Sequence, residues 1–215
     1  FSKSTELDSL LTEKSNHTKK DTFYVLLLID ISSHYTNIVE DYDEGILYAN
    51  EALLVSCNLD YTKGKETAYY FLGTQNLYKG NYEKALENYH ETLKINQNSE
   101  DFAKVGSSLE NIGIVHYYLG DLDKVLEYWK NAEKLYREKK IGEELTDLYD
   151  KLSVVDEAKK QLDTAIYYSN KAIDVHKANK DTASLSHAYV NLGNIYYQPN
   201  GDIESTNKAK FYYLK

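Results

Sequence analysis

The segment LGTQNLYKGNYEKALENY, residues 72–89, decides the fold because its pattern returns at a fixed interval. An apolar residue followed by a small one recurs every 40 residues, in Leu72-Gly73, Ile112-Gly113, Leu152-Ser153 and Leu192-Gly193, and Ser32-Ser33 stands one interval earlier. An internal repeat of this length predicts a chain stacked from copies of one unit. We therefore expect function on the surfaces that stacking creates and not in a single catalytic cleft.

Each interval holds two apolar segments with helical periodicity, separated by a short turn. Small residues repeat on both segments, such as Gly73 on the first and Ala85 on the second, and they let two helices approach closely. The expected helices, in pairs, are Thr22–Val39 with Asp41–Asn58, Tyr61–Lys79 with Asn81–Asn98, Asp101–Leu119 with Asp121–Lys139, and Gly142–Lys159 with Gln161–Asn179, and a fifth pair begins near Asp181. The single proline of the chain agrees with a helical fold.

Two of these copies resemble a tetratricopeptide repeat. The resemblance lies in Leu72-Gly73, Gly80-Asn81-Tyr82, Ala85 and Tyr89, and again in Ile112-Gly113, Gly120-Asp121-Leu122, Val125, Trp129 and Ala132. It implies an all-α, right-handed α-solenoid of antiparallel helix pairs, about five repeats long. The chain departs from the family pattern in its period, which is commonly about 34 residues, and in lacking the proline that closes each repeat.

The repeat divides the chain into two expected regions. Residues 1–20 are predicted to form an N-terminal capping helix, and residues 21–215 a solenoid with repeats near 21–60, 61–100, 101–140, 141–180 and 181–215. The fifth copy is disturbed by a turn signal at Gln198-Pro199-Asn200-Gly201. Ala209 and Tyr212 then follow four residues late, in the places of Ala165 and Tyr168. Because the chain stops at Lys215 in mid-helix, we expect the native polypeptide to continue.

A second resemblance concerns the N-terminal part of the chain. Residues 7–11, 20–22 and 42–53 look like the start of a sensor module in Bacteroidetes-type bacterial signalling proteins. That resemblance implies a tetratricopeptide array placed before a membrane helix and an output domain, which is a histidine kinase, nucleotide cyclase or DNA-binding regulator. A periplasmic or cell-envelope location follows from it, and a cytoplasmic location is the alternative.

Composition excludes several classes of function. A net charge of −9 argues against nucleic acid and against anionic membrane surfaces. The longest apolar run, Phe23 to Ile29, is far shorter than the roughly 20 residues that cross a bilayer. Cys57 is the only cysteine and permits no intrachain disulfide. The six histidines lack metal-site spacing and no glycine-rich phosphate loop occurs. We expect no enzyme, no metal and no cofactor in this segment.

The resemblance also assigns a binding face, because first helices of successive repeats line the concave groove of the family. Asn111 and Asn191 occupy equivalent positions two repeats apart with Lys151 between them, and asparagine can both donate to and accept from an extended peptide backbone. The alternative is that these amides pair with a neighbouring helix or with water. The other expected groove residues are Asn194, Tyr70, Thr74, Tyr78, Ile114, Tyr117, Tyr118 and Tyr197, with Leu27, Asp30, Ile31 and His34 in the first copy.

The tyrosines among these residues have a second interpretation, since the chain contains 22 tyrosines and they could equally be walls of the solenoid. Trp129 is expected in the core between repeats. Two functions remain open on this basis. The first is a module that binds a protein or peptide partner as the sensory part of a bacterial signalling protein. The second is a scaffold or dimerisation module with no ligand in its groove, in which exposed faces join two copies of the chain as a homodimer.

Overall fold

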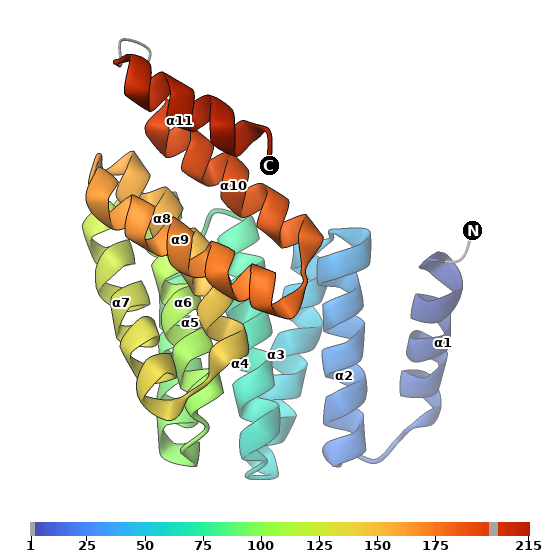
Figure 1. Cartoon of the computed structure of the whole chain (residues 1–215). Coiled ribbons are helices and arrows are strands. Elements are labelled where there is room, and N and C mark those ends of the chain that lie inside the picture. The colour runs from blue at the N-terminus through green and yellow to red at the C-terminus, as the bar shows by residue number, and fades with distance from the viewer. Residues whose placement is uncertain (1–2, 198–201) are drawn as a thin grey trace. The chain divides into compact units, whose positions relative to one another are not determined.

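The computed structural model describes residues 3–197 and 202–215, so the turn predicted at Gln198-Pro199-Asn200-Gly201 lies outside the described part. The described residues form an all-α chain (Figure 1). The elements are α1 (Lys3–Asn16), α2 (Thr22–His34), the π-helical turn η1 (Tyr35–Val39), α3 (Tyr42–Asn58), α4 (Thr62–Tyr78), α5 (Tyr82–Ser99), α6 (Phe102–Tyr118), α7 (Leu122–Lys139), α8 (Gly142–Ala158), α9 (Leu162–Asn179), α10 (Thr182–Tyr196) and α11 (Ile203–Tyr213). The helices predicted between residues 22 and 179 are confirmed to within one residue, with η1 completing the first of them.

Left-handed residues recur every 20 residues and end the helices. Positive φ angles of 51–77° occur at Glu40, Asp60, Gly80, Glu100, Gly120, Lys140, Lys160 and Lys180. One residue further on, the chain folds back onto the helix it has left: the Asn81 N–H donates to the Asn76 carbonyl at 2.8 Å, and the Tyr61 N–H to the Ser56 carbonyl at 2.8 Å. These tight reversals make consecutive helices antiparallel.

Aspartates start several of the helices that follow these turns. The carboxylates of Asp41 and Asp121 accept hydrogen bonds from the backbone N–H groups of Glu44 and Lys124, each at 3.2 Å. Such a bond satisfies one of the free N–H groups at a helix N-terminus. It also lowers the pKa of Asp121, whose charged form it stabilises. In α3 and α7, an aspartate cap fixes the start of the helix and a left-handed turn follows its end.

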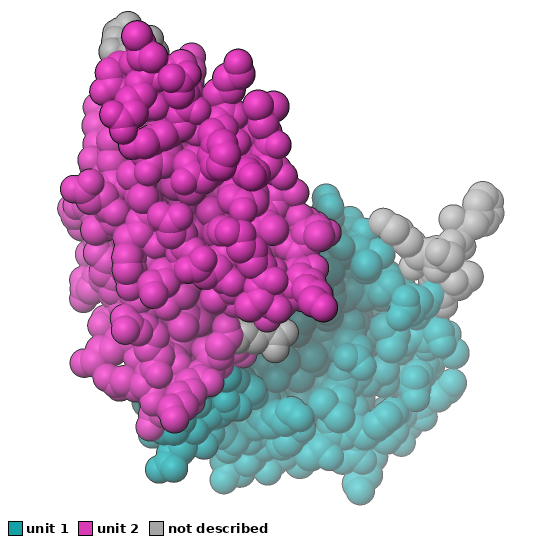
Figure 2. Space-filling view, viewed as in Figure 1, with its two compact units in different colours: residues 1–115 teal, residues 116–215 magenta. Residues whose placement is uncertain are grey.

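The chain divides into two compact units, residues 1–115 and 116–215, with the boundary inside α6 (Figure 2). In unit 1, α2 packs against α3, α3 against α4, and α4 against α5, while α1 packs on α2. In unit 2, α7 to α11 pack in the same consecutive manner. First helices also meet directly, α2 with α4 in unit 1 and α8 with α10 in unit 2. Both units are therefore stacks of antiparallel helix pairs.

The two helices of a pair cross where a small residue lies opposite a ring. A Cβ on Gly73 of α4 would lie 2.7 Å from ring carbons of Tyr89 on α5, and a Cβ on Gly193 of α10 would lie 2.6 Å from the ring of Tyr213 on α11. At the corresponding position of the fourth copy, Ser153 faces Ser169, with their hydroxyl oxygens 2.6 Å apart. A glycine thus accompanies a large partner and a serine a small one, so that each crossing is filled.

The late start of the fifth copy is confirmed by this packing. Ala209 is buried, as are Ala85 and Ala165 at the corresponding position in other copies. Tyr213 then covers Gly193 as Tyr89 covers Gly73, although four more residues separate the two partners. The four extra residues are accommodated before α11, and the crossing itself is preserved.

Polar contacts join consecutive repeats as well. The buried Gln75 amide on α4 donates from Nε2 to the hydroxyl oxygens of Ser32 (2.7 Å) and Thr36 (2.8 Å) on the α2–η1 helix. At the surface, Lys79 pairs with Asp43 in unit 1, and Lys159 pairs with Asp123 in unit 2, exactly 80 residues further along. Surface pairs of this kind add little stability, so the buried apolar contacts and the helix crossings carry most of the stacking.

The left-handed turns lead to a prediction about stability. Nothing lies within 4 Å of a Cβ added to Gly80, so Gly80→Ala causes no clash with a neighbour. Its effect comes from the backbone alone, because alanine is less stable than glycine at the left-handed φ of 77°. We expect it to lower the free energy of unfolding by about 1 kcal/mol, and Lys160→Gly to raise it by a few tenths up to about 1 kcal/mol. Urea unfolding followed by circular dichroism measures both. Gly142→Ala, also without a close contact, is the control and should not destabilise. Changes of the same sign in G80A and K160G would contradict this account.

Candidate functional site

In unit 1, the predicted groove residues of α4 lie together along one side of that helix. Tyr70 and Tyr78 are 39% and 54% exposed, and Thr74 between them is half-buried. The Tyr70 ring packs edge-on against Phe71 at 5.3 Å, and Tyr78 lies beside Tyr42 of α3 with ring centroids 5.4 Å apart. This side of α4 therefore presents two aromatic side chains with a hydroxyl between them.

A tyrosine from the second helix reaches this side of α4, and the sequence did not identify it as a site residue. Tyr89 is 2% exposed, yet its hydroxyl lies 3.0 Å from Thr74 Oγ1. Because Thr74 donates its only proton to the Tyr70 carbonyl at 3.0 Å, the Tyr89 hydroxyl is the donor in this contact. Burial raises the pKa of Tyr89. Gly73 is the feature of the sequence that could have indicated this contact, because its missing side chain leaves room for the Tyr89 ring to cross α4.

The same arrangement recurs in unit 2. The Tyr213 hydroxyl, from the ring that covers Gly193, donates to Asn194 Oδ1 at 2.8 Å. Asn194 follows Gly193 as Thr74 follows Gly73. The carbonyl of Asn194 is thus bonded to a neighbouring helix, which is the alternative considered for the predicted asparagines. Asn194 is exposed, and its side-chain Nδ2 is the group that remains available to a ligand.

Asn111 and Asn191 behave differently from Asn194. Both are half-buried, Asn111 on α6 in unit 1 and Asn191 on α10 in unit 2. Within the described residues, neither side-chain amide makes a hydrogen bond to the protein. Lys151 on α8 is half-buried and stands one repeat before Asn191, on helices that pack directly. In unit 2, Lys151 and Asn191 therefore share one face.

The remaining predicted residues are placed as follows. Ile114 is half-buried on α6 in unit 1. Tyr117 and Tyr118 end α6 in unit 2, 47% and 57% exposed, with rings 6.2 Å apart at a steep angle. Tyr197 is 57% exposed just after α10. The aromatic groove residues are thus largely accessible, whereas Trp129 is buried as the sequence predicts.

The prediction was wrong for two groove residues of the first copy. Leu27 and Ile31 of α2 are 3% and 0% exposed and belong to the core. Helix α2 has α1 as a neighbour in addition to α3 and α4, so less of its surface remains open. His34 is also buried, while Asp30 is exposed.

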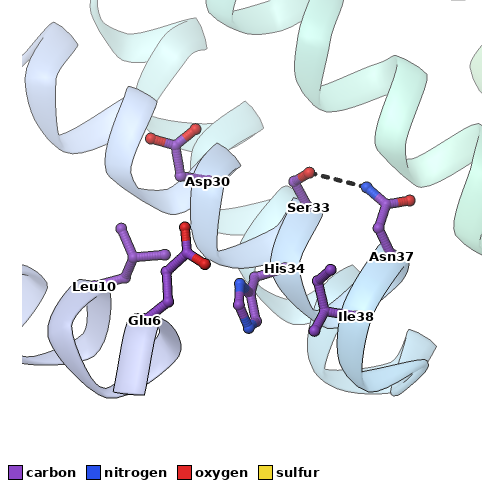
Figure 3. A pocket seen from close by; sticks show the side chains of 7 residues that line it. All are labelled: Glu6, Leu10, Asp30, Ser33, His34, Asn37 and Ile38. Carbon is purple, nitrogen blue, oxygen red and sulfur yellow. Dashed lines mark hydrogen bonds between the residues drawn. The ribbon is translucent and has the colours of Figure 1, made fainter. Parts of the chain in front are cut away.

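A cavity of about 450 Å³ lies between α1 and the α2–η1 helix in unit 1 (Figure 3). In Figure 3, the side chains of Glu6 and Leu10 from α1 lie opposite those from α2 and η1. The lining residues are Glu6, Leu10, Asp30, Ser33, His34, Asn37 and Ile38. The Asn37 amide donates to Ser33 Oγ at 3.1 Å. Although Asp30 is exposed as a residue, partial burial of its carboxyl group raises its pKa.

Other groups with possible chemistry have structural roles. His176 is buried on α9, and its Nε2 lies 2.9 Å from Asp150 Oδ2 on α8, while burial raises the pKa of Asp150. His176 occupies the repeat position of Asn96, whose amide donates to Ser108 Oγ on α6, the first helix of the following repeat, at 3.0 Å. In the described residues, no group of three His, Cys, Asp or Glu side chains could hold a metal ion. Nor is any helix in the described ranges long and apolar enough to cross a membrane.

Comparison with known families agrees with this geometry. Residues 65–138 match the model of the tetratricopeptide repeat family. This part of the chain consists of tetratricopeptide repeats. Among curated proteins, none matches the sequence. The tetratricopeptide repeat is a non-catalytic, scaffold type of fold.

Solved structures share the tetratricopeptide fold at low sequence identity. BtubC from P. vanneervenii has a TM-score of 0.81 at 18% identity, over 100% of this chain and 92% of that one. The signal transduction ATPase with numerous domains (STAND) from Pyrococcus horikoshii, which carries a tetratricopeptide repeat sensor, has a TM-score of 0.77 at 19% identity over 87% of this chain. The present chain spans only 29% of that protein. A Rap protein complexed with competence and sporulation factor has a TM-score of 0.70 at 17% identity, over 86% of this chain and 51% of that one.

The Tyr89–Thr74 contact leads to a second prediction. Tyr89→Phe removes the hydroxyl and keeps the ring over Gly73, so we expect a loss of about 1 kcal/mol in the free energy of unfolding. The control is Tyr78→Phe, whose side chain is 54% exposed and whose change should stay within about 0.5 kcal/mol. Chemical denaturation measures both. Equal effects of the two substitutions would mean that the buried hydroxyl contributes nothing specific.

Proposed function

We propose that this chain is a protein- or peptide-binding tetratricopeptide module that holds an extended partner segment along its first-helix, concave face. The observation that carries the proposal is the state of Asn111 and Asn191. They occupy the same repeat position, are half-buried, and make no side-chain hydrogen bond within the described residues. A half-buried amide with open donor and acceptor groups suits recognition of a peptide backbone, which offers both kinds of partner at every residue.

Exposed aromatic side chains on the first helices of each unit support this proposal. Tyr70 and Tyr78 in unit 1, and Tyr117 and Tyr118 in unit 2, are each at least 39% exposed. Tyrosine contributes a large contact area at a low entropic cost, which is why recognition surfaces favour it. Thr74, held by Tyr89, adds a fixed polar group between Tyr70 and Tyr78. The face therefore combines apolar area with positioned hydrogen-bonding groups.

The same proposal gives the module a sensory role in a larger bacterial signalling protein. The similar STAND protein from Pyrococcus horikoshii carries a tetratricopeptide repeat sensor, and the similar Rap protein is complexed with competence and sporulation factor. Both likenesses establish fold alone, so they support this role without determining it. The proposal includes a protein or peptide as the partner and a histidine kinase, nucleotide cyclase or DNA-binding regulator as the output domain. It also includes a periplasmic or cell-envelope location, with a cytoplasmic location as the alternative.

A scaffold or dimerisation module is the alternative, and one observation favours it. Leu47 and Leu54 are 60% and 61% exposed and stand two turns apart on the same side of α3, a second helix. A row of exposed leucines on a second helix would suit contact with another copy of the chain. Light scattering decides between the peptide-binding and the dimerisation module. A stable dimer that Leu47→Asp dissociates would favour the dimerisation module, and a monomer would exclude it.

Selection from a random-peptide phage library against the immobilised protein tests the main proposal. We expect enriched peptides whose affinity falls about tenfold in the Asn111→Ala/Asn191→Ala variant, since two hydrogen-bonding amides are lost. The control is Asn50→Ala/Asn170→Ala, because these exposed amides donate to carbonyls of their own helices. Failure to enrich any sequence, or equal binding by both double variants, would overturn the proposal.

A further inference from the structure

The cavity beside α1 lies at the beginning of the row of predicted groove residues. Asp30, His34 and Ile38 stand 40 residues before Tyr70, Thr74 and Tyr78, and α2 packs directly against α4 in the same unit. The lining of the cavity and the aromatic side of α4 are therefore successive parts of one face. A segment lying along α4 would reach the cavity at its next step toward α2.

The first copy has no ring at the second-helix position that Tyr89 occupies in the second copy. Ala49, which is buried, occupies the position of Tyr89, and Ser33 occupies the position of Gly73. At that second-helix position the first copy therefore has a small side chain, as the fourth copy does with Ser169. The π-helical turn η1 adds to the difference, because the Glu40 N–H donates to the Tyr35 carbonyl. At the reversal, the Asp41 N–H then bonds a carbonyl six residues back, and not five as Asn81 does in the next copy.

Two carboxylates, those of Glu6 and Asp30, line the cavity. Glu6 and Asp30 form no ion pair with a cation of the described residues. Glu51 of α3, which bonds Tyr24 in the first turn of α2, provides a contrast, because Lys14 and Lys20 lie 3.5 and 3.4 Å from its carboxylate oxygens. The whole of unit 1 is acidic, with 10 lysines against 18 acidic residues, whereas unit 2 has 15 basic and 16 acidic residues. Electrostatic complementarity therefore favours a cationic occupant.

We propose that this cavity receives a lysine or arginine side chain of the extended segment held on the first-helix face. Glu6 and Asp30 bind the charged head group from opposite walls, and Leu10 and Ile38 contact its aliphatic stem. The assignment rests on the proposed function, because the rest of the partner must lie along α4. A volume of about 450 Å³ falls within the range of roughly 300–1,000 Å³ of ordinary ligand pockets.

A matched pair of probes tests this assignment. One is a fluorescein-labelled peptide of alternating arginine and alanine, and the other is its twin with citrulline, an uncharged analogue, in place of arginine. By fluorescence anisotropy we expect the native protein to prefer the arginine peptide by about tenfold, the effect of a charge-assisted hydrogen bond. Glu6→Gln/Asp30→Asn should remove most of this preference.

The control variant separates the cavity from the general acidity of unit 1. Glu83→Gln/Glu87→Gln removes the same two charges from exposed positions of α5 and should keep the preference. Equal losses in the two double variants, or no preference in the native protein, would overturn the assignment. If library-selected peptides depend on Asn111 and Asn191 while the arginine and citrulline peptides bind alike, the peptide-binding function stands and the cavity assignment is wrong. If no library peptide binds, the proposed function itself fails.

Discussion

The close approach of the two helices in each pair is the constraint on which the rest of this structure depends. At Gly73 the backbone of α4 lies directly against the ring of Tyr89, and no larger residue fits there without displacing the ring. The crossing sets the distance between first and second helices. Left-handed turns at 20-residue intervals bring the chain back to it each time. Stacking then follows, because a single pair leaves apolar faces that only its neighbours can cover.

This constraint also shapes the face that we assign to binding. The ring that fills a crossing carries a hydroxyl through to the first-helix face, where Tyr89 bonds Thr74 and Tyr213 bonds Asn194. At the same position the first copy has Ala49 and no ring, and a cavity lined by two carboxylates lies between α1 and the first helix of that copy. The residue at this second-helix position thus decides whether a ring and its hydroxyl reach the first-helix face.

Most of the fold could be predicted from the sequence, because a 40-residue period fixes the helices and the small residues at their crossings. Trp129 in the core and the late fifth copy also follow from register alone. The hydroxyl of Tyr89 could not be predicted, since periodicity marks the residue as buried and says nothing of where its far end emerges. Leu27 and Ile31 were misassigned because the contribution of α1 to the burial of α2 depends on tertiary packing. The cavity depends on α1 and η1 together, and neither shares the repeat pattern.

The central claim is that the two residues at a crossing are chosen together, and one thermodynamic cycle tests it. Gly73→Ser, Tyr89→Ser and the double variant, which reproduces the Ser153–Ser169 pair, are compared by urea unfolding. A serine beneath the ring is overpacked, so the single substitution should cost about 1–3 kcal/mol. In the double variant that cost should largely disappear, giving a favourable coupling energy of about 1 kcal/mol or more. Strictly additive effects of the two substitutions would contradict the account.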